Sequence, residues 1–303
     1  MKLEEIDWPL RPWVEELRRT YGNETSAHAF SSLYIWKTDM DLSLLCRSGF
    51  FAVRFGLRGA NSWFFPCGAA PEVRAFIEER MGKEEPPCRL YYAREAEAAL
   101  LETWFPGRFD IRRSPEDDEY IYDRREQLEL SGKSFRRQRH DLHRAQERHA
   151  LQVSAIGPEN LEQCRQVLNE WKSRPHGHSG NGLMDATAGE TMLRSFRELD
   201  GFGILVREGD RPAAVAAGYP LTESVFDLFV CQQITPDPEV STFARHALLR
   251  ELREEMREVN GEEDLGLEGL RELKEGLRPS RKIEMYACTQ RTESKSEPVR
   301  GPL

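Results

Sequence analysis

The spacing of apolar residues divides the first half of the chain into short helix and strand patterns. Apolar residues recur at helical spacing between Pro9 and Gly22, and similar patterns over Pro71–Met81 and Glu95–Phe105 predict two further helices. Runs rich in aromatic and β-branched residues predict strands at Leu33–Trp36, Phe50–Phe55, Ser62–Phe65, Arg89–Tyr92 and Phe109–Arg112. The predicted order in this half is helix, three strands, helix, strand, helix, strand.

The second half has longer and clearer patterns. Alternation predicts a strand at Leu151–Ile156, and an apolar stripe predicts a long helix from about Glu239 to Arg257. The other predicted elements are the helices Glu159–Lys172 and Ala186–Leu199 and the strands Phe202–Arg207, Ala213–Tyr219, Val225–Val230 and Ile283–Cys288. This order resembles the GCN5-related N-acetyltransferase (GNAT) fold, and the first half repeats it loosely. We therefore expect an α/β fold with mixed (α+β) sheets, arranged as tandem GNAT-like, acyl-CoA N-acyltransferase-like domains.

The length of 303 residues agrees with two domains of about 150 residues each. The expected boundaries give GNAT-like domains over residues 1–130 and 151–288, joined by a basic connecting helix over 131–150. The polar tail over 289–303 is predicted to be disordered.

Composition narrows the function classes. A net charge of −9 excludes a surface that is cationic throughout, as broad nucleic-acid binding needs, although a local basic patch is compatible with it. The six cysteines include no CxxC pair and indicate reduced thiols. No export signal and no apolar run of about 18 residues is present, so a cytoplasmic location without a transmembrane segment is expected. Nothing in the pattern indicates an oligomeric state.

The segment Asn260–Pro279 is the leading candidate site because it places three acids and a glycine in one short turn, followed by a helix with Arg271 and Lys274. Clustered carboxylates repel one another unless cations, helix amides or a bound ammonium compensate them. The alternative is structural: Asp264 caps the helix, its neighbouring acids are solvated, and Arg271 pairs with Glu268 or Glu275.

The same segment resembles the C-terminal signature of the family that includes the soluble domain of phosphatidylglycerol lysyltransferases. The matching positions are Asn260, Glu262, Glu263, Asp264, Leu265, Gly266, Leu270, Arg271 and Lys274. The resemblance implies that Asn260, Glu262 and Asp264 are catalytic, with Glu262 and Asp264 holding or deprotonating an amine. It also implies that Arg271 and Lys274 grip a phosphate or carboxylate. The related aminoacyl-tRNA-dependent families, which include the peptidoglycan-bridge enzymes, are likewise tandem GNAT-like proteins.

A second candidate is the basic segment Ser131–His149, with six Lys or Arg and three His against two acids. It is similar to the family's Ser-Gly-Lys turn and basic helix, which favours Lys133, Arg137 and Arg144 as contacts for the phosphates of tRNA, or for another anionic ligand. The alternative is a solvated helix between domains that pairs with acids of the first domain.

A third candidate is the Gly-rich loop Trp171–Asp185, predicted to lie on the acceptor side. Trp171, Arg174 and, farther along, Glu190 match family preferences, whereas the alternative is a loop whose composition reflects flexibility. No metal is expected. His140 with His143, and His176 with His178, lack a cysteine or acid at zinc-site spacing.

A conventional acetyl-CoA site is disfavoured, and no other cofactor is expected with certainty. The turn Ile234–Val240 before the long helix has no glycine and no cation, but two prolines and two acids that repel phosphate. The family usually has a Glu-Lys pair at the end of the preceding strand, where this chain has Cys231, Gln232 and Gln233. This departure weakens any reaction that depends on that acid.

These observations predict an acyl- or aminoacyltransferase that takes aminoacyl-tRNA as donor and an amine or hydroxyl acceptor, either a small molecule or a headgroup. The alternative is a non-catalytic GNAT-like binding module that binds RNA or an anionic partner through its basic helix.

Overall fold

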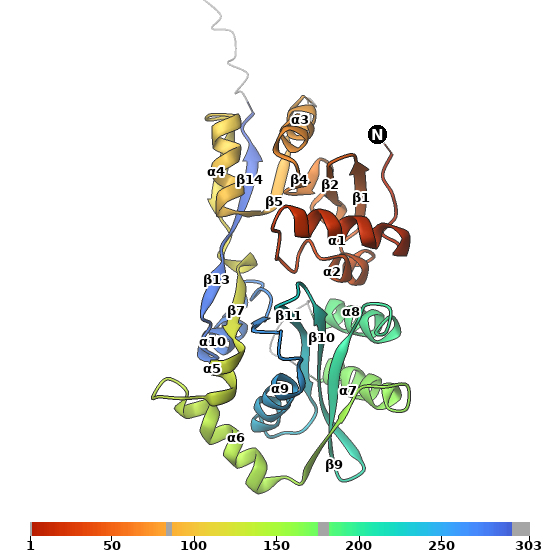
Figure 1. The fold of residues 1–303 in the computed structure, drawn as a ribbon, viewed down its shortest axis with the longest axis vertical. Helices are drawn as coiled ribbons and strands as arrows, with labels where there is room; N and C mark the ends of the chain where they lie inside the picture. The colour runs from red at the N-terminus through yellow and green to blue at the C-terminus, as the bar shows by residue number, and fades with distance from the viewer. Residues whose placement is uncertain (1, 83–86, 175–181, 293–303) are drawn as a thin grey trace, which may run out of the picture.

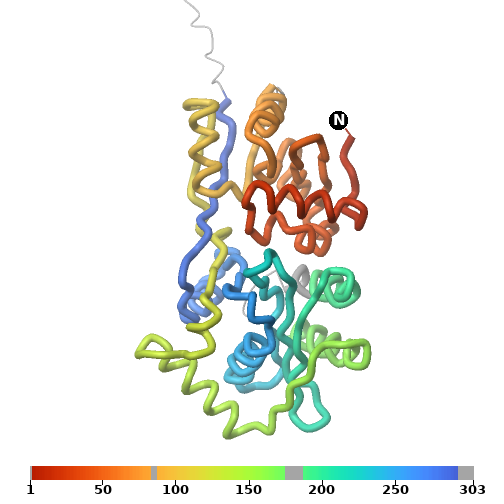
Figure 2. Tube along the Cα trace, in the orientation of Figure 1, coloured from red at the N-terminus to blue at the C-terminus, as the bar shows by residue number. Residues whose placement is uncertain are grey.

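A computed structural model of the chain describes residues 2–82, 87–174 and 182–292. Two lobes follow one another along the long axis of the molecule, and each is built around one sheet (Figures 1 and 2). Both sheets combine parallel and antiparallel pairs, which confirms the expected α/β class with mixed sheets. No helix among the described residues is both long enough and apolar enough to cross a membrane.

The upper sheet in Figure 1 has the strand order β1-β2-β3-β5-β14-β6, with β4 paired to β2. Its strands are β1 (Leu42–Arg47), β2 (Phe50–Phe55), β3 (Ser62–Phe64), β4 (Cys67–Gly68), β5 (Arg89–Arg94), β6 (Phe109–Arg113) and β14 (Met285–Gln290). Its helices are α1 (Arg11–Thr20), α2 (Phe30–Trp36), α3 (Ala70–Met81) and α4 (Glu95–Trp104). Apolar residues of α1 and α2 pack in one core cluster and those of α3 and α4 in another, so both faces of the sheet are covered.

The lower sheet has the order β13-β7-β12-β11-β10-β9-β8. Its strands are β7 (Glu119–Asp123), β8 (Leu151–Ala155), β9 (Phe202–Glu208), β10 (Arg211–Pro220), β11 (Val225–Gln233), β12 (Glu258–Asn260) and β13 (Arg281–Ile283). Its helices are α5 (Arg124–Glu129), α6 (Arg136–Arg148), α7 (Leu161–Ser173), α8 (Gly182–Arg194), α9 (Glu239–Glu251) and α10 (Glu268–Gly276). One core cluster joins α7 and α8 to the sheet, and another joins α9 to it.

The two sheets exchange strands. β7 precedes residue 130 but pairs with β12 and β13 in the lower sheet, whereas β14 follows the whole lower lobe and pairs with β5 and β6 in the upper sheet. The division at 130, 150 and 288 remains a prediction about folding units, and the chain crosses between the lobes more often than that division implies.

Three predicted elements differ from the structure. The predicted last strand Ile283–Cys288 is divided at Glu284 between β13 and β14, which belong to different sheets. Leu33–Trp36 is part of the helix α2 and not a strand, because a short apolar run has no period to distinguish the two and five residues of this helix are buried. The long helix α9 ends at Glu251 and not near Arg257. Met256 extends the apolar pattern because it folds back into the same core, 2% exposed.

Candidate active site between the two lobes

The end of β12 places the acidic turn of the signature segment inside the molecule. β12 pairs in parallel with β11 for three residues only, from Val225–Glu258 to Asp227–Asn260. β11 continues through Gln233, whereas β12 ends at Asn260 and the chain turns away from the sheet at Gly261. The acids after Gly261 therefore lie where two neighbouring strands part, and the loop before α2 of the upper lobe reaches the same place.

A small, partly open pocket with a cavity volume of about 30 Å³ lies between α2 and this acidic turn. Its lining residues are Ser26, Ala27, Ser32, Leu33, Trp36, Met40, Leu42, Phe64, Tyr92, Glu262 and Glu263. The lining is aromatic and aliphatic except for two small hydroxyls, the Tyr92 hydroxyl and the two carboxyl groups. Such a pocket suits a ligand with an apolar stem and a cationic end.

Four carboxyl groups interact around the acidic end of the pocket. Burial and the charges of Asp227 and Glu263 raise the pKa of Glu262 well above its ordinary value. Burial raises the pKa of Glu263 to about 7, although Lys274 lowers it. Burial, followed by the charge of Glu119, raises the pKa of Asp227, although the nearby Tyr219 hydroxyl lowers it. Asp227 is 0% exposed, and neither of its oxygens has a hydrogen bond of ordinary geometry among the described residues. The buried acids therefore favour their neutral forms, and a cation beside them would favour the ionised forms again.

Lys274, from α10, is the cation that acts on this cluster. Its Nζ donates to the carbonyl oxygen of Gly261 at 2.6 Å and to that of Glu263, so it holds the turn by its backbone. Burial lowers the pKa of Lys274 even though Glu263 and Glu262 raise it. Lys274 does not line the pocket itself. Its effect on a ligand is indirect, because its charge lowers the pKa of Glu263, which does line the pocket.

Asn260 and Glu119 position the site. Glu119 is 1% exposed and accepts from Ser26 N at 2.9 Å, Ser26 Oγ at 2.9 Å and Asn260 Nδ2 at 2.5 Å, which joins the two lobes. Asn260 Oδ1 in turn accepts from Glu262 N at 2.7 Å. Asn260, expected among the catalytic residues, is thus a buried link between Glu119 and the backbone of Glu262.

Glu262 has a left-handed backbone, with φ of 56°. This conformation favours glycine or asparagine and costs a glutamate of order 1 kcal/mol or more. A strained residue whose carboxyl group lines a pocket is a candidate for function, because a glycine would make the same turn without strain.

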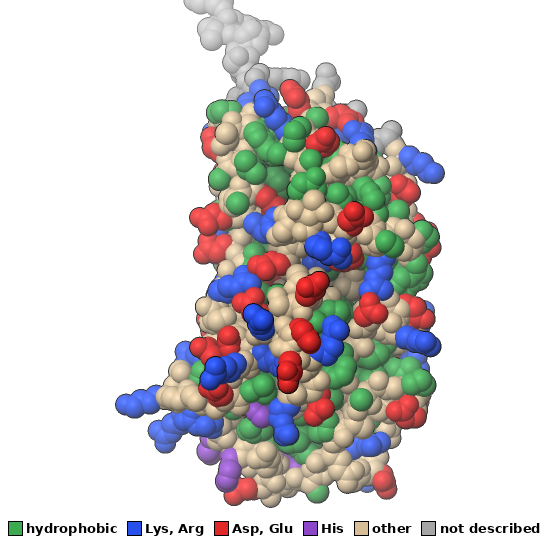
Figure 3. Space-filling view, viewed as in Figure 1, with side chains coloured by type: hydrophobic (Ala, Val, Ile, Leu, Met, Phe, Trp, Pro, Cys, Tyr) green, Lys and Arg blue, Asp and Glu red, His purple; other side chains and the backbone are tan. Residues whose placement is uncertain are grey.

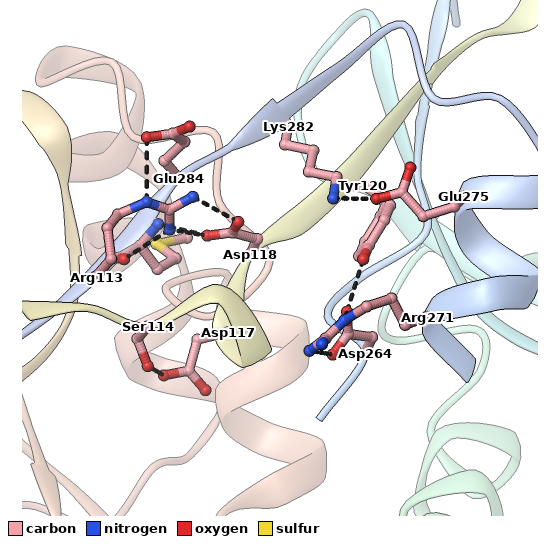
Figure 4. A network of polar contacts seen from close by, with 11 residues as sticks. Arg113, Ser114, Asp117, Asp118, Tyr120, Asp264, Arg271, Glu275, Lys282 and Glu284 are labelled. Atoms are coloured by element: carbon pink, nitrogen blue, oxygen red, sulfur yellow. Dashed lines mark hydrogen bonds and ion pairs between the residues drawn. The ribbon is translucent and has the colours of Figure 1, made fainter. Parts of the chain in front are cut away.

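Asp264 and Arg271 form a separate structural pair. Figure 4 shows the carboxylate of Asp264 facing Arg271 and Tyr120. It accepts from Arg271 Nε at 2.8 Å, Arg271 Nη2 at 2.9 Å and the Tyr120 hydroxyl at 2.6 Å. Burial alone would raise the pKa of Asp264, but the guanidinium and the hydroxyl outweigh it and lower the pKa. Asp264 is 0% exposed and does not line the pocket.

The structural alternative for this turn is wrong in its details. α10 begins at Glu268 with Leu267 as the preceding residue and no side-chain cap, so Asp264 does not cap the helix. Arg271 pairs with Asp264, and Glu275 pairs instead with Lys282 (Figure 4).

The basic helix is divided between paired and exposed cations. Arg144 lies 3.4 Å from Glu239, so this part of α6 packs against α9 of the same lobe and not against acids of the first domain. Lys133 is exposed, and Arg137 is 90% exposed with only a 3.8 Å contact to Asp141. Figure 3 shows Lys and Arg side chains projecting at the lower left, where Figure 1 places α5 and α6.

The third candidate group lies outside the pocket lining. Arg174 donates to Glu170 Oε1 at 3.0 Å and to the carbonyl oxygens of Thr235 and Ile234, which holds the turn before α9. Glu190 pairs with Arg165 at 3.1 Å, and Trp171 is partly buried on α7. Residues 175–181 of the Gly-rich loop, including His176 and His178, lie outside the described part of the chain.

Comparison with known families now identifies the chain. The family described as "Phosphatidylglycerol lysyltransferase, C-terminal" matches residues 18–289, and the protein belongs to this family. A search of curated proteins gives no match.

Solved structures agree on the fold. A conserved protein of unknown function from Bacteroides thetaiotaomicron VPI-5482 is similar with a TM-score of 0.87 and 22% identity, covering 96% of this chain and 100% of that one. L-PGS from Bacillus licheniformis has a TM-score of 0.65 and 15% identity, covering 96% of this chain and 94% of that one. FemX has a TM-score of 0.62 and 9% identity, covering 95% and 97%. The expected tandem GNAT-like architecture, similar to that of FemX, is confirmed.

Sequence reasoning missed two carboxyl groups of the site. Asp227 lies in the otherwise apolar stretch of β11, and a charged residue there is a signal that it faces a polar interior. Glu119 lies among tyrosines and an isoleucine of β7, where nothing local distinguishes it from the acids just before it. Only the strand exchange brings β7 beside β12 and thus beside the signature segment.

Proposed function

We propose that the protein transfers an aminoacyl or acyl group from an ester donor to an amine, with the amine held at the carboxyl groups of the pocket. The observation that carries this proposal is the excess of buried acid: Glu262 and Glu263 line a pocket whose other walls are mostly apolar. A cationic amine is the ligand class that relieves this charge. Membership of the lysyltransferase-related family supports an aminoacyl-tRNA ester as the donor.

The proposed reaction begins with proton transfer. A carboxylate with a pKa of about 7, as burial gives Glu263, accepts a proton from an ammonium near neutral pH. The amine nitrogen then forms a bond to the ester carbonyl carbon, and the C–O bond to the donor breaks. The departing oxygen takes this proton back from Glu263 and leaves as a hydroxyl. The regenerated Glu263 carboxylate accepts the second proton, which the nitrogen loses as the amide forms, and releases it to water.

The other residues have supporting roles in this proposal. Glu262 holds the ammonium before transfer, and Lys274 limits the charge of the turn. Arg271 fits an oxyanion role poorly, because two of its nitrogens donate to Asp264. Asn260 and Glu119 are positioning residues, since their polar atoms bond to one another and to backbone amides.

The test is a transfer assay with tRNAs that carry labelled amino acids and a panel of primary amines and hydroxyl acceptors. Glu263→Gln should abolish transfer, whereas the matched control Glu275→Gln, on the exposed surface of α10, should leave it intact. Equal rates of donor consumption with and without the protein, across the panel, would remove the enzymatic proposal.

A binding module without catalysis is the second candidate, and the exposed cations of the basic helix favour it. Lys133 and Arg137 are exposed, and the ion pair of Arg137 with Asp141 is long, at 3.8 Å. The departure at Gln232 and Gln233 from the family's usual Glu-Lys pair agrees with this alternative. In this alternative, charged and uncharged tRNA bind equally well, with a salt dependence that Arg137→Gln reduces by about one unit of slope. A clear preference for the charged form would favour the transferase instead.

A further inference from the structure

A second cluster of ionisable side chains lies where α6, β9 and the turn before α9 meet. His149 directly follows α6, Glu208 ends β9, and Asp237 and Glu239 belong to the turn and first residue of α9. None of these four residues lines the pocket between the lobes. They come from three separate segments of the chain, so residue spacing gave no indication of the cluster.

His149 has an unpaired nitrogen in this cluster. Its side chain is only 9% exposed, and its Nδ1 lies 3.0 Å from Glu208 Oε1. Its Nε2 has no hydrogen-bond partner among the described residues and lies 3.6 Å from Asp237 Oδ2. A buried polar nitrogen directed at carboxylates but bonded to none of them is costly unless something occupies the space between.

We propose that His149, Asp237 and Glu239 bind a divalent cation of the zinc class. One imidazole nitrogen and two carboxylate oxygens form a ligand set that Zn²⁺ accepts. Their candidate ligand atoms all lie within 4.8 Å of one another. Bonds of about 2.1 Å separate tetrahedral ligand atoms by roughly 3.4 Å, so modest side-chain rotation closes the set.

Glu208 orients the histidine for this role. When Nδ1 donates its proton to the Glu208 carboxylate, Nε2 presents its lone pair to Asp237 and Glu239. A carboxylate behind a metal-binding histidine fixes the tautomer and raises the basicity of the ligand nitrogen. Asp237 is 27% exposed on its side chain, which leaves an approach for water as a fourth ligand.

Two arginines face the same acids and must be accommodated. Arg148 contacts Asp237 Oδ1 at 3.2 Å and Glu239 Oε1 at 2.7 Å, and Arg144 reaches the same Oε1 at 3.4 Å. The arginines thus contact Oδ1 of Asp237 and Oε1 of Glu239, whereas the Asp237 oxygen that lies 3.6 Å from His149 Nε2 is the other one, Oδ2. Glu208, Asp237 and Glu239 together have one more charge than the two arginines. The cluster therefore has a net negative charge when His149 is neutral, and this charge is compatible with a bound dication.

The site would attach the end of the basic helix to the lower sheet. α6 already packs against α9, and a metal joining His149 to the turn before α9 would fix the direction in which the cations of α6 project. The turn that lacks a phosphate-binding loop would then serve as a metal-stabilised corner.

The test uses the full chain after removal of metal with a chelator. Titration with Co²⁺ should give visible absorption bands of a tetrahedral site at one equivalent, and added Zn²⁺ should displace them and raise the melting temperature. His149→Asn and Asp237→Asn should abolish the bands, and Glu208→Gln should weaken binding about 10- to 100-fold. His143→Asn is the matched control, because His143 is exposed and its one ion pair with a described residue is the 3.2 Å contact to Glu147.

Two outcomes would overturn the proposal. One is the absence of any Co²⁺ spectrum and any Zn²⁺-dependent melting shift in the wild-type chain. The other is binding that persists unchanged in Asp237→Asn and His149→Asn. If a variant fails to fold, the wild-type titration and the Glu208→Gln variant still decide the matter.

Discussion

Replacing Asp227 by asparagine is expected to stabilise the protein, which is unusual for a change to a fully buried residue. Asp227 is 0% exposed, and neither of its oxygens has a hydrogen bond of ordinary geometry among the described residues. Burial and then Glu119 raise its pKa, and this effect outweighs the Tyr219 hydroxyl, which lowers it. A carboxyl group in such a place is retained at a cost to stability. Asparagine has nearly the same shape and no charge, so it removes that cost.

The magnitude follows from the charge that has to be buried. Leaving one polar group unsatisfied costs about 1–3 kcal/mol, and an unpaired charge costs more, unless the group takes up a proton instead. We therefore expect Asp227→Asn to raise the free energy of unfolding by about 1–2 kcal/mol near neutral pH. The gain is no larger because the asparagine side chain still has unpaired polar atoms. For a chain of this size, that corresponds to a rise in melting temperature of roughly 2–8 °C.

The raised pKa of Asp227 also predicts how the stability difference between Asp227→Asn and wild type changes with pH. Because the pKa of Asp227 is higher in the folded protein, its contribution favours folding fully below the unfolded value of about 3.9. That contribution is lost as the pH rises through the raised folded value. The advantage of Asp227→Asn should therefore be small near pH 4 and increase with pH.

The assay is urea or thermal unfolding of wild type, Asp227→Asn and the control Asp110→Asn across this pH range. Asp110 is a partly exposed acid paired with Arg112, and its replacement should change stability by less than about 0.5 kcal/mol. The reasoning is refuted if Asp227→Asn is less stable than wild type at every pH. In that case, Asp227 forms a stabilising interaction.

Three further predictions concern the acidic turn. Asp264→Asn should lower the free energy of unfolding by about 2 kcal/mol, a value reduced for solvent screening because Arg271 is 44% exposed. A double-mutant cycle with Arg271→Gln measures the coupling of the pair, and additive effects of the two changes would contradict the pairing. Glu262→Gly should change the unfolding free energy by less than about 1 kcal/mol while removing ligand binding, because glycine adopts the φ of 56° without strain; Glu262→Ala should be the less stable of the two in urea unfolding, and the reverse order would argue against strain. The transfer rate should rise as the pH passes the value of about 7 for Glu263, because the base must be deprotonated, and a flat profile between roughly pH 6 and 8 would exclude Glu263 as the base.

The sequence was most informative where a pattern was long or a residue type unusual. The strands β8 to β11 of the lower sheet and the helices α3, α4 and α7 follow from periodicity, and the acidic turn after Asn260 was located by its density of charge. The short strands β7 and β12 were not predicted. α2 was missed because seven residues are too few to show a period.

The partners of the acidic turn were not predictable, because they come from distant segments. Glu119 lies on β7 and Ser26 precedes α2, and their hydrogen bond depends on the lobes meeting. The separation of roles within the turn was equally hidden. Glu262 and Asp264 are two residues apart, yet one lines the pocket and the other faces Arg271, because backbone conformation and not composition decides which way each side chain points.

The central claim is that the pocket between the lobes binds a cationic amine through its carboxyl groups. The most direct measurement compares the binding of hexylamine and hexanol, two ligands with the same apolar stem, by calorimetry or chemical-shift titration. We expect hexylamine to bind in preference to hexanol, and Glu262→Gln with Glu263→Gln to remove that preference while Glu275→Gln retains it. Equal affinity for the two ligands, or a preference that survives the loss of both pocket carboxylates, would contradict the account.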